Sequence, residues 1–272
     1  MKQMQKAYRI SEVAPYIDWL YFFHAWGLSG KPETVKQQLM DDARDMLAVM
    51  ENRYRTLGIA AVCRANSDGD DIVIEGLHLP MLRQQRPSMG TGYCLCMADF
   101  VRPLSTHVAD RMGVFATTVD AGMETDFKAD AYQAMLAQTL ADRLAEATAE
   151  KLHEEVRKTL WGYAPGENLS VSQLHHGEYQ GIRPAIGYPS MPDVSLNFML
   201  DRLLGFRHIG ISLTENGMMQ PHASVSGLMI AHPEARYFDL GEIGEDQLAD
   251  YAHRCGCPTE QAERFLRKSF LK

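Results

Sequence analysis

The stretch from Gln180 to Asp193 restricts the fold more than any other part of the chain. It reads QGIRPAIGYPSMPD, and each of its three prolines lacks a backbone N–H donor and fixes φ at about −65°. A residue before proline favours extended backbone, so the segment suits neither a helix nor the middle of a strand. The sequence therefore predicts a stiff, irregular loop that presents one guanidinium, Arg183, and one phenol, Tyr188.

This loop has two possible roles when its composition is considered alone. The planar guanidinium of Arg183 can hold a carboxylate in a bidentate pair. A rigid loop also loses little entropy when a ligand binds. A structural Pro-rich crossover with an exposed arginine accounts equally well for the composition.

Size and charge bound the class of protein. The 272 residues suffice for one large domain or two small ones, and 46% hydrophobic with 23% charged residues is typical of a soluble globular protein. A formal net charge of −8 argues against nucleic acid as a partner. There is no apolar run long enough to span a bilayer and no signal-peptide core after Met1, so we expect a cytoplasmic protein without a membrane partner.

The five cysteines include two C-x-C pairs, Cys94 with Cys96 and Cys255 with Cys257. Neither pair has the C-x-x-C spacing of zinc ribbons or redox motifs. The two pairs together could form a four-thiolate metal site, but free, reduced cysteines are the preferred interpretation in a cytoplasmic protein. The aspartate-rich turn at 66–70 lacks the later glutamate of a calcium loop. We therefore expect no metal site.

Hydrophobic periodicity indicates alternating helices and strands. Helices are expected over residues 34–55, 126–163, 244–252 and 259–270, and strands over 58–63, 72–74, 114–119, 209–213, 224–230 and 234–240. The helix at 126–163 has an apolar ladder of leucines four residues apart, and the strand at 234–240 is expected to pair with 224–230. These elements lack a regular βαβ rhythm, which favours an α+β fold.

Three further side chains have both a structural and a functional interpretation. Asp18 lies between Ile17 and Trp19, so its carboxylate is partly shielded and needs a cationic partner, although a helix N-cap or an exposed acid is the commoner role. Glu146 and His153 are seven residues apart on one face of the long helix, and such groups are usually solvated.

Residues 183–189, RPAIGYP, resemble the R-P-A-x-G-Y-P motif of the C-terminal activation domain of cobalamin-dependent methionine synthase. The similarity continues in order through residues 16–19, 26–31, 82–85, 98–101, 141–150, 152–154, 156–158, 161–165, 167–170, 179–181, 223–227 and 232–233. It therefore covers nearly the whole chain and is more specific than any single motif.

The resemblance implies a fold and a function. It implies one domain over residues 1–272, with a twisted, mostly antiparallel sheet, a long central helix and flanking helices. The family's domain binds S-adenosylmethionine and helps to remethylate oxidised cobalamin, which a partner module carries, with electrons from a flavodoxin-like donor. Because the sequence begins at Met1, we expect a stand-alone reactivation subunit, and we do not expect it to complete turnover alone.

The resemblance also implies which residues contact the ligand. The expected set is Asp18, Glu146, Glu178, Arg183, Ala185, Tyr188, Met229 and Ile230. Arg183 would pair with the α-carboxylate of S-adenosylmethionine, Asp18 with its ammonium group, and Tyr188 would lie where the methyl group meets cobalamin. No side chain is expected to act as a catalyst, because the reduced cobalt is the nucleophile.

The chain departs from the family at two places. The family has an adjacent Tyr-Phe pair where this chain has Met229 and Ile230, and a glycine where this chain has His222. An alternative function is therefore a binding module for a corrinoid protein or nucleotide that no longer uses S-adenosylmethionine. A stand-alone methyltransferase is a weaker alternative, because no motif positions a general base.

Overall fold

The computed structural model describes residues 1–87 and 92–266. Within them, six strands form a sheet in the order β4-β3-β2-β5-β8, with β1 also paired to β2, and every pairing is antiparallel. The strands are β1 (Lys2–Tyr8), β2 (Thr56–Asp68), β3 (Asp71–Ile74), β4 (Leu77–Pro80), β5 (Asp110–Val119) and β8 (Ser224–Met229). The expected antiparallel sheet of an α+β fold is confirmed.

The long strand β2 organises the sheet. Its first half pairs with β1 and its last residues with β3, while β5 runs along its other side from Thr56 to Ala65. Successive β2 side chains point to opposite faces, so Ile59 and Ala61 enter one hydrophobic core while Ala60 and Val62 enter the other. Both faces of the sheet are therefore covered, which explains why β2 is an almost continuous apolar run.

The long helix α5 (Ala131–Glu155) continues into a π-helical turn, Val156–Leu160. The leucine ladder is buried against one face of the sheet, as predicted. The helix begins later than the predicted residue 126, because the Asp130 side chain accepts a hydrogen bond from Gln133 N at 2.8 Å and caps it. Residues just before this cap instead belong to the short helix α4 (Gly122–Thr125).

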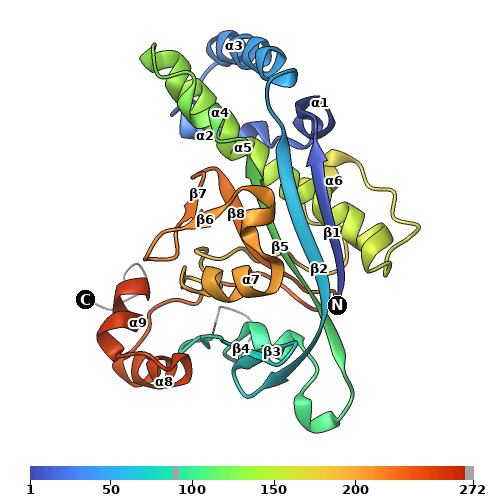
Figure 1. The fold of residues 1–272 in the computed structure, drawn as a ribbon, viewed down its shortest axis with the longest axis vertical. Coiled ribbons are helices and arrows are strands. Elements are labelled where there is room, and N and C mark those ends of the chain that lie inside the picture. Colours follow the sequence, from blue (N-terminus) through green and yellow to red (C-terminus); the bar gives the residue numbers. More distant parts are fainter. Residues whose placement is uncertain (88–91, 267–272) are drawn as a thin grey trace.

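The remaining helices lie on both sides of the sheet (Figure 1). In that view α7 (Leu196–Leu204) is in front of the sheet and α5 behind it, and their buried residues belong to the two separate cores. The others are α1 (Ile10–Val13), α2 (Trp19–Ala25), α3 (Glu33–Glu51), α6 (Val171–His175), α8 (Glu245–Cys255) and α9 (Thr259–Leu266), with 3-10 turns at Ala14–Tyr16, Met97–Phe100, Leu104–Thr106 and Phe206–Ile209.

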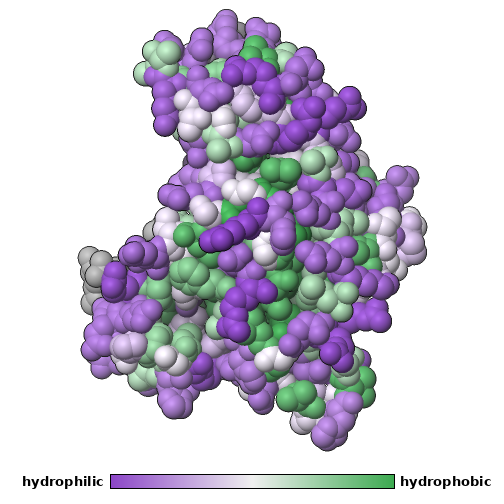
Figure 2. Space-filling model, viewed as in Figure 1, coloured by the Kyte–Doolittle hydropathy of each residue, from purple (hydrophilic) through white to green (hydrophobic). Residues whose placement is uncertain are grey.

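Helices α3, α8 and α9 confirm three sequence predictions, although residues 267–270 of the last predicted helix lie outside the described part. Within the described residues, no helix combines the length and the apolar character needed to cross a membrane. Hydrophilic residues cover most of the face in Figure 2, and hydrophobic residues gather in patches near its middle.

One predicted strand is much shorter than expected, and another is wrong. Residues 209–213 contain only the two-residue strand β6 (Ser212–Leu213), which follows the 3-10 turn Phe206–Ile209 and pairs with β7 (Met219–Gln220). Residues 234–240 form no strand. The Pro-rich loop occupies the position beside β8 that this strand was expected to take, since Ile182 and Ile230 exchange backbone hydrogen bonds there.

Candidate functional site

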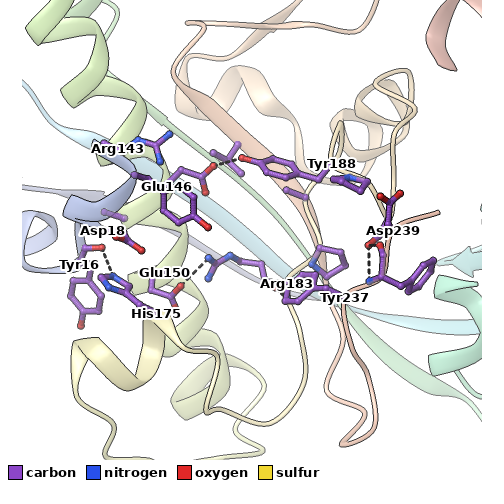
Figure 3. Close-up of a pocket in the computed structure, with 18 residues that line it drawn as sticks. Tyr16, Asp18, Arg143, Glu146, Glu150, His175, Arg183, Tyr188, Tyr237 and Asp239 are labelled. Atoms are coloured by element: carbon purple, nitrogen blue, oxygen red, sulfur yellow. Dashed lines mark hydrogen bonds and ion pairs between the residues drawn. The ribbon is translucent and has the colours of Figure 1, made fainter. Parts of the chain in front are cut away.

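A cavity of about 810 Å³ lies between α5, the residues around the start of α2 and the Pro-rich loop. Figure 3 shows Glu146 and Glu150 on α5 with Arg183 and Tyr188 of the loop facing them. The wall of the cavity also includes Val225 of β8. The cavity is therefore built from elements that are far apart in the sequence.

The backbone of the loop is held tightly against β8. Ile186 N donates to Ser226 O at 2.9 Å, and Leu228 N donates to Pro184 O at 3.0 Å. Gly227 permits this approach, because a Cβ atom there would lie 2.2 Å from the Pro184 carbonyl oxygen. The rigid loop predicted from its prolines is thus anchored by the sheet edge, and it presents Arg183 from a defined position.

Arg183 is not the exposed arginine of the structural crossover that was one of the two interpretations of the loop. Its side chain is 12% exposed, and its Nη2 donates to Glu150 Oε2 at 3.0 Å while Nη1 donates to Ala149 O at 3.2 Å. Burial by itself would lower the pKa of Arg183, but the charge of Glu150 raises it above its ordinary value. The guanidinium stays charged, and its Nε has no hydrogen-bond partner among the described residues.

Asp18 has the commoner of the roles considered for it and also faces the cavity. It is the N-cap of α2, and its Oδ1 accepts from Leu20 N at 2.9 Å. It also lines the cavity together with Arg183, and no hydrogen bond joins its Oδ2 to another described residue. The helix thus fixes the orientation of the carboxylate, and one oxygen remains for a ligand.

Tyr188 and Glu146 form a second contact between the loop and α5. The Tyr188 hydroxyl donates to Glu146 Oε1 at 2.7 Å, and Tyr188 is 51% exposed. Burial raises the pKa of Tyr188, and the neighbouring Glu146 charge raises it further, so the phenol stays protonated. Both residues line the cavity, at the more open side of the loop.

His153 does not share a solvated face with Glu146, so that expectation is wrong. His153 is fully buried, and its ring meets Tyr179 edge-on with 4.9 Å between centroids. Burial, and then the charges of Arg183 and Arg157, lower the pKa of His153 well below its ordinary value. The imidazole is therefore neutral. The packing of Tyr179 over α5 removes this face from water, which helical periodicity alone does not reveal.

The eight residues of the predicted ligand set separate into two groups. Asp18, Glu146, Arg183, Ala185 and Tyr188 line the cavity, whereas Glu178, Met229 and Ile230 do not. Glu178 is exposed and accepts from Gln173 Nε2 at 2.8 Å. Met229 and Ile230 are 1% and 3% exposed and belong to the two hydrophobic cores.

The prediction missed several charged or polar residues of the wall: Arg143, Glu150, His175, Tyr237 and Asp239. Arg143, Glu146 and Glu150 are spaced three and four residues apart, which places them on one helix face and could have been noticed in the sequence. The lining contains four carboxylates and two guanidinium groups, so its formal charge is −2 with His175 neutral. Such a wall attracts cationic ligands.

The described residues contain no group of three or more His, Cys, Asp or Glu side chains arranged to hold a metal ion. All five cysteines are free, and Cys63 and Cys96 are buried. Burial raises the pKa of the Cys63 thiol to about 11 and that of the Cys96 thiol to about 12. The chemistry of the cavity thus rests on its carboxylates, guanidinium groups and phenols.

Two comparisons with known proteins identify the family and the fold of the chain. The family model described as "Vitamin B12 dependent methionine synthase, activation domain" matches residues 9–256. A crystal structure described as the MetH reactivation domain bound to AdoHcy is 37% identical in sequence, with a TM-score of 0.93, and the match covers 100% of this chain and 91% of that one. A family match over most of the chain, joined to the same fold at this identity, shows that the chain belongs to the activation-domain family of vitamin B12-dependent methionine synthase.

Proposed function

We propose that this chain binds S-adenosylmethionine in the cavity between α5 and the Pro-rich loop, and supports the reductive methylation of oxidised cobalamin in a methionine synthase. The observation that carries the proposal is the match to a reactivation domain bound to AdoHcy. AdoHcy is S-adenosylhomocysteine, the molecule that remains when S-adenosylmethionine has given up its methyl group. A ligand of this size fits a cavity of about 810 Å³.

The charges of the cavity suit the amino-acid tail of this ligand. Arg183 would receive the α-carboxylate through the donors that Glu150 and Ala149 leave free, and the unpartnered oxygen of Asp18 would accept from the ammonium group. S-adenosylmethionine carries one net positive charge because of its sulfonium, whereas S-adenosylhomocysteine carries none. A lining of formal charge −2 therefore favours the methylated form.

Cobalamin, carried by the partner module, would supply the reduced cobalt that takes the methyl group. The residues of this chain would position the sulfonium methyl and exclude water from it. Tyr188, held by Glu146 at the more exposed side of the loop, would lie where the ligand meets the partner. A flavodoxin-like protein would provide the electrons. In this proposal no side chain of the chain forms a bond to the methyl group.

The alternative is a corrinoid or nucleotide module that has lost the use of S-adenosylmethionine. Its basis is the replacement of the family's aromatic pair by Met229 and Ile230. Both of these side chains are buried outside the cavity lining, so their replacement leaves the charged part of the wall unchanged. This arrangement favours the first proposal.

Isothermal titration calorimetry of the full chain with S-adenosylmethionine tests the proposal directly. We expect micromolar binding, and weaker binding of S-adenosylhomocysteine that depends less on salt, because only the sulfonium form interacts with the net charge of the wall. Absence of binding to both ligands would exclude the proposal and favour the alternative module.

A further inference from the structure

Glu150 of α5 lies in the cavity wall beside Arg183, one helical turn after Glu146. Its side chain is 9% exposed, and its Oε2 lies 3.0 Å from Arg183 Nη2. The preceding residue, Ala149, accepts from Arg183 Nη1 at 3.2 Å. Two consecutive residues of one helix therefore hold the guanidinium from the same side. Figure 3 shows the guanidinium directed toward Glu150 across the cavity.

The backbone of Arg183 is held independently of its side chain. Arg183 N donates to the Tyr237 hydroxyl at 2.9 Å, and the loop on both sides is bonded to β8 and its continuation. The side chain still has several rotatable bonds between this backbone and the guanidinium, and ordering such a chain costs conformational entropy. Glu150 is the carboxylate that forms an ion pair with the guanidinium in the described structure. It therefore restricts the side chain to one orientation before any ligand arrives.

The pair also leaves binding capacity unused. A guanidinium has five N–H donors in a planar fork, and the contacts to Glu150 and Ala149 use one donor each of Nη2 and Nη1. A ligand carboxylate can therefore bind Arg183 while the ion pair persists. Without Glu150, the Arg183 side chain would have to be ordered when the ligand binds. Its buried charge would also have no ion-pair partner before the ligand arrives.

We propose that Glu150 is a positioning residue for ligand binding: it orients the Arg183 guanidinium toward the carboxylate of the ligand's amino-acid tail. This inference rests on the proposed binding of S-adenosylmethionine in the same cavity. It assigns a different task to each of the two glutamates on this helix face, because Glu146 contacts Tyr188 while Glu150 contacts Arg183. Glu150 acts through Arg183 and needs no contact with the ligand.

A double-mutant cycle in the full chain tests this assignment. We expect Glu150→Ala to weaken the binding of S-adenosylmethionine and S-adenosylhomocysteine at least tenfold, and Glu150→Gln to recover part of that loss because an amide oxygen still accepts a hydrogen bond. In an Arg183→Gln background, Glu150→Gln should change the dissociation constant less than twofold. Losses that simply multiply in the double variant would show that Glu150 does not act through Arg183.

A second ligand separates positioning from a general structural role. 5′-Methylthioadenosine has the adenosine and the thioether but no amino-acid tail, so its affinity should change less than twofold in Glu150→Ala. Equal losses for 5′-methylthioadenosine and S-adenosylhomocysteine would mean that Glu150 merely supports the cavity. Unchanged affinity for both would also overturn the inference.

Two controls keep the result unambiguous. Glu155→Gln changes a carboxylate of the same helix that pairs with Lys6 and Lys151 outside the cavity, so it should bind all ligands like the wild type. Thermal melts establish that each variant is folded at the temperature of titration. If the wild-type chain binds neither adenosyl ligand, the proposed function fails; if it binds both and the Glu150 variants bind equally well, only the positioning role fails.

Discussion

The hydroxyl of Tyr188 donates to Oε1 of Glu146 at 2.7 Å, one helical turn before the point where Glu150 pairs with Arg183. Helix α5 therefore holds the Pro-rich loop at two places, through two glutamates four residues apart. The backbone of the same loop is bonded to β8 on its other side. The cavity lies where the loop faces α5, and residues of α5, the loop and β8 line it. Its shape therefore depends on the contacts of the loop with both α5 and β8.

The Tyr188–Glu146 contact should contribute measurably to stability. Tyr188→Phe and Glu146→Gln should each lower the free energy of unfolding by about 1 kcal/mol, because a hydrogen bond to a carboxylate is lost at a half-exposed site. Urea denaturation of both single variants and the double variant measures the coupling between them. Effects that add completely would show that the two side chains do not interact in solution.

Asp18 can be tested with two substitutions that separate its roles. Asp18→Asn keeps a side-chain oxygen for the N-cap of α2 but removes the charge, whereas Asp18→Ala removes both. We expect both variants to weaken S-adenosylmethionine binding, and only the alanine variant to lose about 1 kcal/mol of stability. Titration calorimetry and chemical denaturation measure the two effects. Wild-type affinity in Asp18→Asn would exclude a charge interaction between Asp18 and the ligand.

Buried His153 should make the protein sensitive to acid. The pKa of His153 is lowered in the folded state, so the imidazole is neutral when the protein is folded. Above a pH of about 6.5, the ordinary pKa that His153 has in the unfolded chain, it is neutral in both states and does not reduce stability. Below that pH the unfolded state binds the extra proton. Stability should then fall by up to about 1.4 kcal/mol per pH unit on account of this group.

His153→Phe removes the titrating group and keeps a ring beside Tyr179. Between pH 7 and pH 5 its unfolding free energy should fall less than that of the wild type. Urea denaturation at a series of pH values provides the comparison. Parallel pH profiles for the two proteins would mean that His153 has the same pKa in the folded and unfolded states, against the direction set by its burial and by the charges of Arg183 and Arg157.

The close approach of the loop to β8 predicts a large effect of one methyl group. Gly227→Ala would place Cβ at 2.2 Å from Pro184 O and 2.9 Å from Ala185 Cα, both backbone atoms that cannot move aside without shifting the loop. We expect a loss of about 1–3 kcal/mol in stability together with weaker ligand binding. Gly166→Ala is the matched control, since nothing lies within 4 Å of its added Cβ. Equal stability of the two variants would contradict the observed packing.

Local patterns in the sequence determined much of this protein. The leucine ladder predicted the long helix, because burial of an apolar stripe follows from helical spacing alone. The prolines predicted a rigid loop, since they restrict φ in any context. The order of motifs along the chain indicated the family, and with it five residues that line the cavity.

The tertiary structure alone decided how these parts meet. The loop, and not residues 234–240, lies beside β8, because Gly181 and Gly227 let two backbones approach where any side chain would clash. The pair of Arg183 with Glu150 joins residues 33 positions apart, and it exists only once the loop is docked on α5. Burial of His153 likewise depends on Tyr179 arriving from another segment. Periodicity reports which face of an element is apolar, but a charge pair or a buried histidine depends on which distant segment covers that face.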